Sequence, residues 1–261
     1  MNRVNKAFEK ARDEGRTALM PYLTAGDPPG PGLAELIKAL DGAGADVIEI
    51  GIPFSDPIAD GPVIASAMHR ALERGVTPEH VFDQIQASRE SVEAALVAMV
   101  SVSIVTHIGI DEFIDQARAS GLDGLIVPDA DLDDFSPLAE ACARSNLVLI
   151  PLIAPTTSVE RQQVIAREGS GFLYLLARAG VTGERADAPD VSERIKALRN
   201  LTDLPIGVGF GISTSDHVRA VGEHADGAII GSALVRALSE AHQSRQDVAA
   251  VAAGFVRSLR A

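Results

Sequence analysis

Several features that mark common protein classes are scarce or missing in this sequence. Its single cysteine, Cys142, excludes internal disulfides and agrees with a reducing compartment. No apolar run approaches the roughly 20 residues of a membrane helix, and the N-terminal segment Met1–Glu14 lacks the apolar core of a signal peptide. We therefore expect a cytosolic protein. Cys142 lies between two alanines in a predicted helix, where a packed thiol is expected and a nucleophile is not.

Basic residues are also few. The chain has 23 Lys and Arg against 36 Asp and Glu, for a formal net charge of −13. Such a surface repels nucleic acid and anionic membranes, and no basic cluster offsets it. An anionic substrate would therefore have to be held by local dipoles and not by the overall field of the protein.

The lysines and histidines exclude two kinds of catalytic chemistry. Four lysines (Lys6, Lys10, Lys38 and Lys196) all fall on predicted helices, which excludes a Schiff-base aldolase. The six histidines show no paired metal-ligand spacing, so we expect no metal and no cofactor. Only His107 lies near a predicted active rim, whereas His217 and His224 are expected to be solvated on one helix.

The most informative stretch is Asp46–Pro62, which reads D-V-I-E-I-G-I-P-F-S-D-P-I-A-D-G-P. Its first part is an apolar run typical of a buried strand, with the carboxylate of Glu49 inside it. Alternation along a strand puts Val47 and Glu49 on one face and Ile48 and Ile50 on the other. The proline-rich loop that follows carries more acids, and each of these acids has an alternative interpretation as an ordinary turn or cap residue. Glu49 has no such alternative, because acids are rarely buried without a partner or a purpose.

Apolar strand-like runs alternate with amphipathic segments along all 261 residues, which favours a single (β/α)8 TIM barrel in one domain, residues 1–261. The predicted strands are Ala18–Leu23, Val47–Ile50, Leu96–Val102, Gly124–Val127, Leu147–Ile150, Phe172–Leu176, Ile206–Val208 and Ala228–Ile230. The predicted helices between them are Gly32–Ala43, Val63–Glu73, Pro78–Glu90, Asp111–Ser120, Asp134–Arg144, Val159–Arg167, Val191–Leu198 and Ser215–Val221. The long second gap therefore holds an extra helix, and a helix over Val4–Glu14 should plug the lower end of the barrel. An open doubly wound sheet is disfavoured because the turn after the first strand lacks its glycine-rich pattern.

In such barrels the chemistry lies on the loops at the carboxyl ends of the strands. Those loops carry Glu49 and Asp60 after the second strand, with Tyr174 on the sixth strand. Glycine-rich turns follow the last three strands, at Gly180–Gly183, Gly209–Ser213 and Gly231–Ser232. Exposed backbone N–H groups and helix N-termini at these turns predict a phosphate site. The two carboxyls remain as acid and base, in an apolar mouth where burial raises a carboxyl pKa towards neutrality.

Four motifs resemble one family. The segments Glu49–Pro62, Leu175–Gly183 (L-L-A-R-A-G-V-T-G), Gly209–Ser213 (G-F-G-I-S) and Gly231–Val235 (G-S-A-L-V) are similar to the signatures of tryptophan synthase alpha subunits. The resemblance implies a (β/α)8 barrel that cleaves indole-3-glycerol phosphate to indole and glyceraldehyde 3-phosphate without a cofactor. It also implies a pyridoxal-phosphate beta subunit as partner, in an alpha2-beta2 complex.

The same resemblance implies roles for particular residues. Glu49 corresponds to the general acid and base that protonates indole C3, and Asp60 to the group that accepts the indole N–H. Tyr174 and Phe210 are expected beside the substrate. The phosphate is expected on the residues of the glycine-rich turns, namely Thr182, Gly183, Gly211, Gly231 and Ser232. The segment Ala179–Asp190 is expected to be a lid over the site.

Two loops depart from the family pattern. The third strand usually ends with a tyrosine and Asn-Pro, but this chain has Ser101, Val102 and Ser103 there. After the fourth strand, Asp129-Ala130-Asp131 replaces the usual Asp-Leu-Pro. Both loops belong to the family's surface for the beta subunit, so Ser101, Ser103 and Asp131 bear on that partnership and not on the lyase chemistry. Two alternatives stay open: a catalytically weak subunit that activates a partner, and another phosphosugar isomerase on the same barrel.

Overall fold

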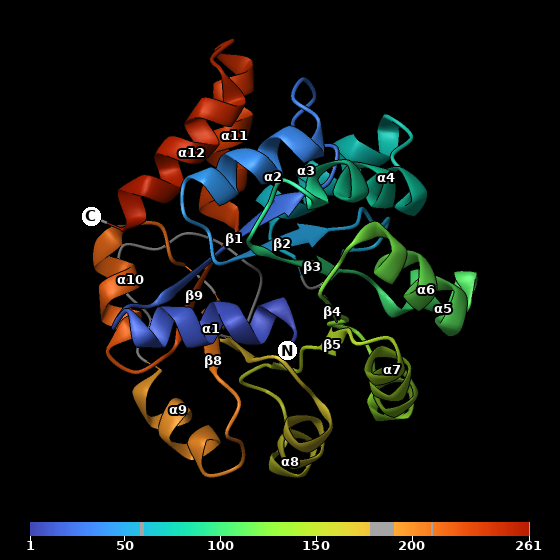
Figure 1. Cartoon of the computed structure of the whole chain (residues 1–261), viewed down its shortest axis with the longest axis vertical. Helices are drawn as coiled ribbons and strands as arrows, with labels where there is room; N and C mark the ends of the chain where they lie inside the picture. The colour runs from blue at the N-terminus through green and yellow to red at the C-terminus, as the bar shows by residue number, and fades with distance from the viewer. Residues whose placement is uncertain (58–59, 178–190, 210, 261) are drawn as a thin grey trace.

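The centre of the molecule is a curled sheet of parallel strands with helices around its outside (Figure 1). The computed structural model describes all residues except 58–59, 178–190, 210 and 261. Nine strands follow the order β5-β4-β3-β2-β1-β9-β8-β7-β6, and each pair is parallel. They are β1 (Ala18–Thr24), β2 (Val47–Gly51), β3 (Ala95–Met99), β4 (Gly124–Ile126), β5 (Val148–Leu149), β6 (Leu152–Ile153), β7 (Leu173–Leu176), β8 (Ile206–Gly209) and β9 (Gly227–Ile230). The predicted α/β barrel is confirmed.

Strands β5 and β6 together occupy the position of the predicted fifth strand. They lie at opposite ends of the strand order, but only Ile150 and Pro151 separate them in the chain. The Ile150 amide still donates to Leu125 on one side (2.9 Å), and the Pro151 carbonyl accepts from Tyr174 on the other (2.8 Å). Since proline has no N–H, the ladder is interrupted there, and the sheet ends meet across two residues.

The helices are α1 (Arg3–Asp13), α2 (Leu33–Gly42), α3 (Pro62–Glu73), α4 (Pro78–Arg89), α5 (Val102–Ile108), α6 (Ile110–Ser120), α7 (Leu132–Arg144), α8 (Val159–Glu168), α9 (Ser192–Arg199), α10 (Ser215–Gly222), α11 (Ser232–Gln243) and α12 (Val248–Leu259). As predicted, β2 and β3 are joined by two helices, α3 and α4. Helix α1 lies across one end of the barrel (Figure 1). Its buried face includes Val4 and Phe8, and the Phe8 ring lies 5.2 Å from the ring of Phe172, centroid to centroid.

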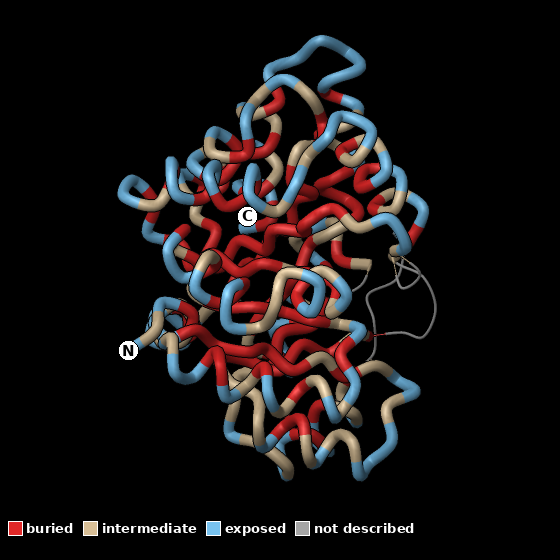
Figure 2. The backbone as a smooth tube through the Cα atoms, turned by 90° about the vertical axis from the view of Figure 1, so that its right-hand side faces the viewer, coloured by how far each residue is buried: buried red, intermediate tan, exposed pale blue. Residues whose placement is uncertain are grey.

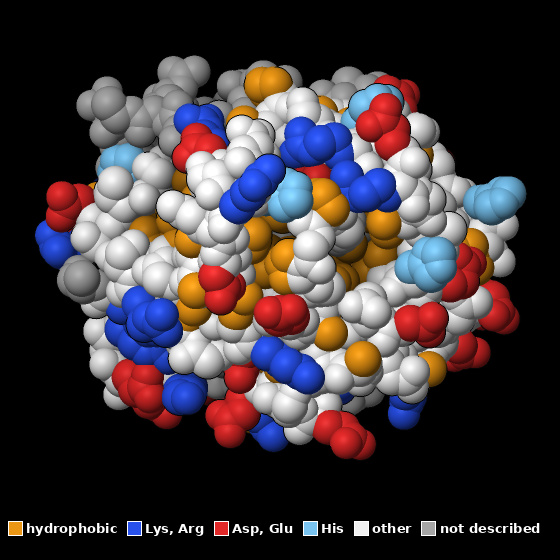
Figure 3. Space-filling view, turned by 90° about the horizontal axis from the view of Figure 1, so that it is seen from above, with side chains coloured by type: hydrophobic (Ala, Val, Ile, Leu, Met, Phe, Trp, Pro, Cys, Tyr) orange, Lys and Arg blue, Asp and Glu red, His pale blue; other side chains and the backbone are white. Residues whose placement is uncertain are grey.

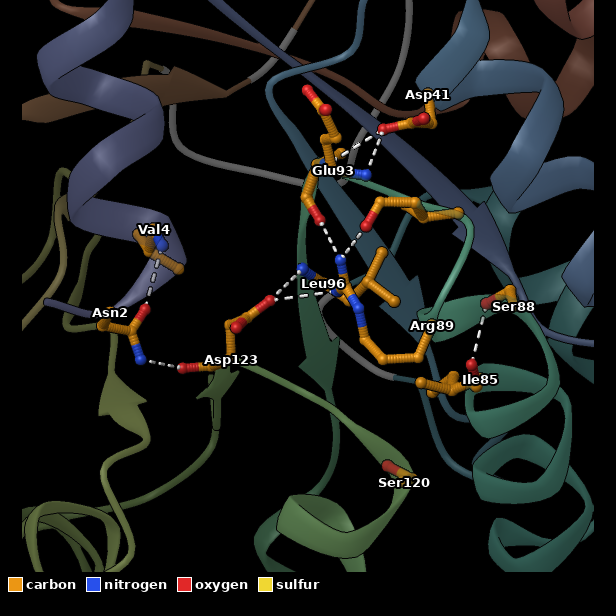
Figure 4. A network of polar contacts seen from close by, with 12 residues as sticks. Asn2, Val4, Asp41, Ile85, Ser88, Arg89, Glu93, Leu96, Ser120 and Asp123 are labelled. Carbon is orange, nitrogen blue, oxygen red and sulfur yellow. Dashed lines mark hydrogen bonds and ion pairs between the residues drawn. The ribbon is translucent and has the colours of Figure 1, made fainter.

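Polar contacts hold the chain at the end of the barrel that α1 covers (Figure 4). The Asn2 amide donates to the Asp123 carbonyl (2.8 Å), and the Asn2 side chain also caps α1. The Asp123 carboxylate accepts from the Leu96 amide (2.9 Å) and pairs with Arg89 (3.3 Å). These bonds tie α1, α4 and the starts of β3 and β4 together, which is consistent with a stabilising role for this end of the barrel.

The structure corrects the prediction at the end of the third strand. The strand was predicted to reach Val102, but β3 ends at Met99 and α5 begins at Val102. The Ser101 side chain caps α5 by accepting from the Ser103 amide, which turns the chain into a helix. Helices α5 and α12 were not predicted, and α11 was predicted only as a helix or helical turn after Gly231-Ser232.

Every residue of β2 is buried, and the two core clusters that its side chains join confirm the predicted faces. Val47 packs inside the barrel with Met20, Val97 and Phe172, whereas Ile48 and Ile50 belong to the layer between strands and helices. Buried residues lie along the middle of the molecule, and exposed residues lie in the loops and on the outer faces of the helices (Figure 2). Glu49 points to the same side as Val47, which is the inside of the barrel.

Helices α11 and α12 pack against each other, and α12 also packs on α2, at the top of Figure 1. The face seen from that end has apolar side chains in a hollow, with acidic and basic side chains mixed around it (Figure 3). In the part of the chain that the structure describes, no helix has both the length and the apolar character needed to cross a membrane.

Candidate active site

A cavity of about 520 Å³ lies at the carboxyl ends of the strands. Residues from β1, β2, β3, β6, β7 and β9 line it, together with the loops that follow several of these strands. Most of its wall is apolar, including Ile64, Met99 and Ile229, and a few polar groups converge on it. This combination is typical of a small-molecule site.

Glu49 lies at the base of this cavity. Its register partners are Tyr22 on β1 and Val97 on β3. The side chain has no exposed surface, and neither carboxyl oxygen has a hydrogen-bond partner among the described residues. Burial raises the pKa of Glu49 well above its ordinary value. Glu49 therefore holds its proton more tightly than an exposed glutamate does.

Asp60 lines the same cavity from the loop after β2. Its amide donates to the Pro57 carbonyl (3.0 Å), which fixes the backbone next to the carboxyl. Burial raises the pKa of Asp60 to about 6. Both carboxyls therefore hold their protons more tightly than exposed carboxyls do, and burial is the cause in each case. Such a pair can provide an acid and a carboxylate in one site.

The only two tyrosines of the chain, Tyr22 and Tyr174, also line the cavity. Each hydroxyl lies over the last glycine of a neighbouring strand, Tyr22 over Gly51 and Tyr174 over Gly209. Tyr174 was predicted beside the substrate, but Tyr22 was missed. Its position on the same strand face as Met20, two residues before the end of the strand, was the signal that could have found it.

Three of the predicted phosphate residues meet at one side of the cavity. Gly211, with a φ of +77°, follows β8, while Gly231 and Ser232 form the start of α11. No described side chain caps α11, so the amides of its first turn and the helix dipole are available to an anion. Thr182, Gly183 and Phe210, and the predicted lid Ala179–Asp190, lie outside the described residues.

The two loops that depart from the family pattern have structural partners. The Ser101 hydroxyl donates to the Asp129 carboxylate (2.6 Å), which also accepts from the Val102 amide (2.9 Å). Ser101, Ser103 and Asp129 lie on the cavity wall. Asp131 caps α7 by accepting from the amides of Asp133 and Asp134. The acid at position 131 therefore has a role within the chain.

Other predicted residues take up structural positions. Asp46 accepts from the Leu19 amide (2.8 Å) and pairs with Arg16 and Arg260, so it supports the start of β2. Cys142 is buried on α7, and burial raises the pKa of its thiol to about 12, as expected of a packed thiol. The four lysines lie on helices α1, α2 and α9, as predicted.

The prediction for His217 was wrong, and that for His224 was right about its exposure but wrong about its helix. His217 was expected to be solvated, but it is buried, and its Nδ1 accepts from the Ser213 amide (3.4 Å). His224 is exposed but lies beyond the end of α10, so the two do not share a helix. His217 packs under the loop that carries Gly211, a contact that helical spacing alone could not reveal.

Known proteins resemble this chain over its full length. The family model described as "Tryptophan synthase alpha chain" matches residues 8–260. A tryptophan synthase alpha chain from Alkalilimnicola ehrlichii is 42% identical over 262 residues and covers 100% of this chain and 96% of its own length. One from Synechocystis is 44% identical over 247 residues, with 92% of each chain covered. The crystal structure of tryptophan synthase subunit alpha from Legionella pneumophila has a TM-score of 0.92 and 34% identity, covering 100% of this chain and 97% of that one.

Proposed function

This chain belongs to the tryptophan synthase alpha chain family, and from this membership and the cavity we propose how its residues carry out the family reaction. The reaction is the lyase step of tryptophan biosynthesis that cleaves indole-3-glycerol phosphate to indole and glyceraldehyde 3-phosphate. One observation carries the proposal. Two buried carboxyls, each with a raised pKa, share a cavity with the N-terminus of α11.

Glu49 supplies and then recovers the proton that the cleavage needs. As the protonated acid, it delivers its proton to indole C3, which leaves a cationic indolenine. The bond from C3 to the glycerol carbon then breaks as the hydroxyl on that carbon loses its proton to the Glu49 carboxylate and becomes an aldehyde. The electrons of the broken bond return to the ring, and neutral indole forms. A buried carboxyl without a fixed partner suits both directions of this transfer.

Asp60 stabilises the cation that forms between these steps. With a pKa of about 6 it carries a negative charge at neutral pH, and it accepts the N–H of the indole ring. The attraction grows as positive charge develops on the ring, so it favours the intermediate over the bound substrate. Tyr174, and Phe210 by resemblance, border the ring.

Backbone amides hold the phosphate at the other side of the cavity. The first turn of α11 with Gly231 and Ser232, and the turn at Gly211, supply them, with Thr182 and Gly183 by resemblance. These local dipoles allow a chain with a net charge of −13 to bind a dianion. No metal or cofactor enters the proposed steps.

The family implies a beta subunit as partner, and we extend this to an alpha2-beta2 complex. The loop with Ser101 and Asp129 and the start of α7 at Asp131 lie at the family's surface for that subunit. Their hydrogen bonds within the chain keep both loops ordered without the usual proline and tyrosine.

Substitution of Glu49 tests the proposal. Glu49→Gln removes the acid while keeping its size, so indole release should fall by at least about a thousandfold with an unchanged circular dichroism spectrum. Retained turnover would remove Glu49 from the mechanism. Glu140→Gln, on the exposed side of α7, is the matched control. Assays with and without a beta subunit separate this enzyme from a catalytically weak activating subunit, which would release indole in neither case.

A further inference from the structure

Among the described residues, the Asp60 carboxylate has no cationic partner in the cavity. The described residues that line the cavity include four acids (Glu49, Asp56, Asp60 and Asp129) and no Lys, Arg or His. The Asp129 carboxylate already accepts from the Ser101 hydroxyl and the Val102 amide. No described residue donates a hydrogen bond to the Asp60 side chain. Where no cation is near, a buried carboxylate that ionises needs a neutral hydrogen-bond donor to stabilise its charge.

In the described part of the chain, the Tyr22 hydroxyl is a donor without an acceptor. Only 3% of Tyr22 is exposed, and its ring extends from β1 over Gly51 towards the open end of the barrel. The hydroxyl accepts a long hydrogen bond from Thr24 Oγ1 (3.4 Å), but its own proton has no acceptor among the described residues. Since donors are rarely left unused when buried, this proton is available to a group in the cavity.

Electrostatics distinguishes the two tyrosines. After burial, the charge that raises the pKa of Tyr22 most is Asp60, ahead of Glu49. For Tyr174 the order is reversed, with Glu49 ahead of Asp60. Geometry agrees with this order for Tyr22, because its ring packs in one cluster with Ile64 and Met68 of α3, the helix that begins two residues after Asp60.

We infer that the Tyr22 hydroxyl donates a hydrogen bond to the Asp60 carboxylate and holds that carboxylate against the indole nitrogen of the substrate. Tyr22 acts through Asp60 and is a positioning residue. The inference rests on the proposed function of Asp60. A hydrogen bond to the charged form favours ionisation, so Tyr22 also keeps Asp60 ionised at neutral pH.

The absence of tryptophan allows a direct test. The chain has no Trp and two Tyr, so Tyr174→Phe leaves Tyr22 as the only source of phenol fluorescence. Phenol emission is quenched when the hydroxyl donates to a carboxylate. In the Tyr174→Phe protein, emission should fall as the pH rises through about 6, the pKa of Asp60. Adding Asp60→Asn should abolish this change, and adding Glu49→Gln or Asp56→Asn should leave it in place.

Steady-state kinetics provides a second test of the contact between Tyr22 and Asp60. Tyr22→Phe keeps the ring that packs over Gly51 and removes only the hydroxyl. It should move the acidic limb of the kcat/KM profile upwards by about half to one pH unit, because Asp60 loses its donor. A role in packing alone would leave that limb in place.

Two outcomes would overturn the inference. One is emission that does not change between about pH 5 and 8, and the other is a change that persists in the Asp60→Asn protein. The assay for Asp60 itself is separate. Full indole release by Asp60→Asn alone would overturn the proposed function of Asp60, whereas an Asp60-dependent fluorescence change would still establish the contact.

Discussion

The Tyr174 hydroxyl lies so close over Gly209 that a Cβ at that glycine would stand 2.5 Å from it. Tyr22 has the same relation to Gly51, where an added Cβ would also collide with the phenol oxygen. The two glycines end β8 and β2, and each neighbours the strand that carries the tyrosine. Because these two glycines have no side chain, the rings of Tyr22 and Tyr174 can occupy the space beside them at the cavity wall.

Substitution of Gly51 should therefore damage the site through Tyr22. Gly51→Ala should displace the ring, lower indole release at least about tenfold and cost about 1–3 kcal/mol of unfolding free energy, because the barrel interior is already filled. Indole assays and urea denaturation measure the two effects. Gly254→Ala, on α12 with open space around it, should instead stabilise by about 0.5–1 kcal/mol and keep full activity. Equal behaviour of the two variants would contradict this role of Gly51.

The stability of the protein should depend on pH through Glu49. Burial raises the pKa of Glu49 in the folded state, so the folded protein holds this proton more tightly than the unfolded chain. Stability from this group is fully present below the ordinary carboxyl pKa and is lost as pH rises towards the folded pKa, by up to about 1.4 kcal/mol for each pH unit. Glu49→Gln should therefore become more stable than the parent as pH rises, in urea denaturation at several pH values. Glu140→Gln should show no such trend, and a constant difference for Glu49→Gln would refute the linkage.

Activity should rise with pH as Asp60 ionises. The pKa of Asp60 is about 6, and its carboxylate is needed to stabilise the indolenine cation, so kcat/KM should increase through this pH. At higher pH, activity should fall as Glu49 loses the proton that it delivers to carbon. The measurement is a kcat/KM profile from about pH 5 to 9 with indole-3-glycerol phosphate. A flat profile below neutral pH would exclude Asp60 as the ionising group.

Substrate binding should be sensitive to the backbone at Gly211. Its φ of +77° lies in the left-handed region, so Gly211→Ala should strain the turn by about 1 kcal/mol and rotate its amides away from the phosphate. KM should rise several-fold, and inorganic phosphate should inhibit more weakly. Gly15→Ala is a matched control, because Gly15 has a φ of +65° and follows α1, far from the cavity. It should carry a similar cost in stability with KM unchanged, and a similar rise in KM would argue against a phosphate site at Gly211.

Much of the barrel could be predicted from local patterns. The apolar alternation of Val47–Ile50 placed Glu49 inside, and glycine-rich turns after late strands indicated the phosphate end. The end of β3 could not be predicted in this way. It depends on the Asp129 carboxylate, which meets Ser101 and the Val102 amide from 28 and 27 residues away. The helical pattern likewise predicts that His217 is exposed, but the loop with Ser213 and the neighbouring core bury it.

The sequence by itself determined the periodicity of strands and helices, the acids of the second strand and its loop, and the family to which the chain belongs. These features are local, because side-chain alternation, proline stiffness and glycine-rich turns act over a few neighbouring residues. Closure of the barrel determined which groups share a cavity. It also left Glu49 without a hydrogen-bond partner among the described residues and placed Tyr22 opposite it across β1 and β2. These facts depend on contacts between distant segments, since burial and pKa are properties of the surroundings that folding assembles.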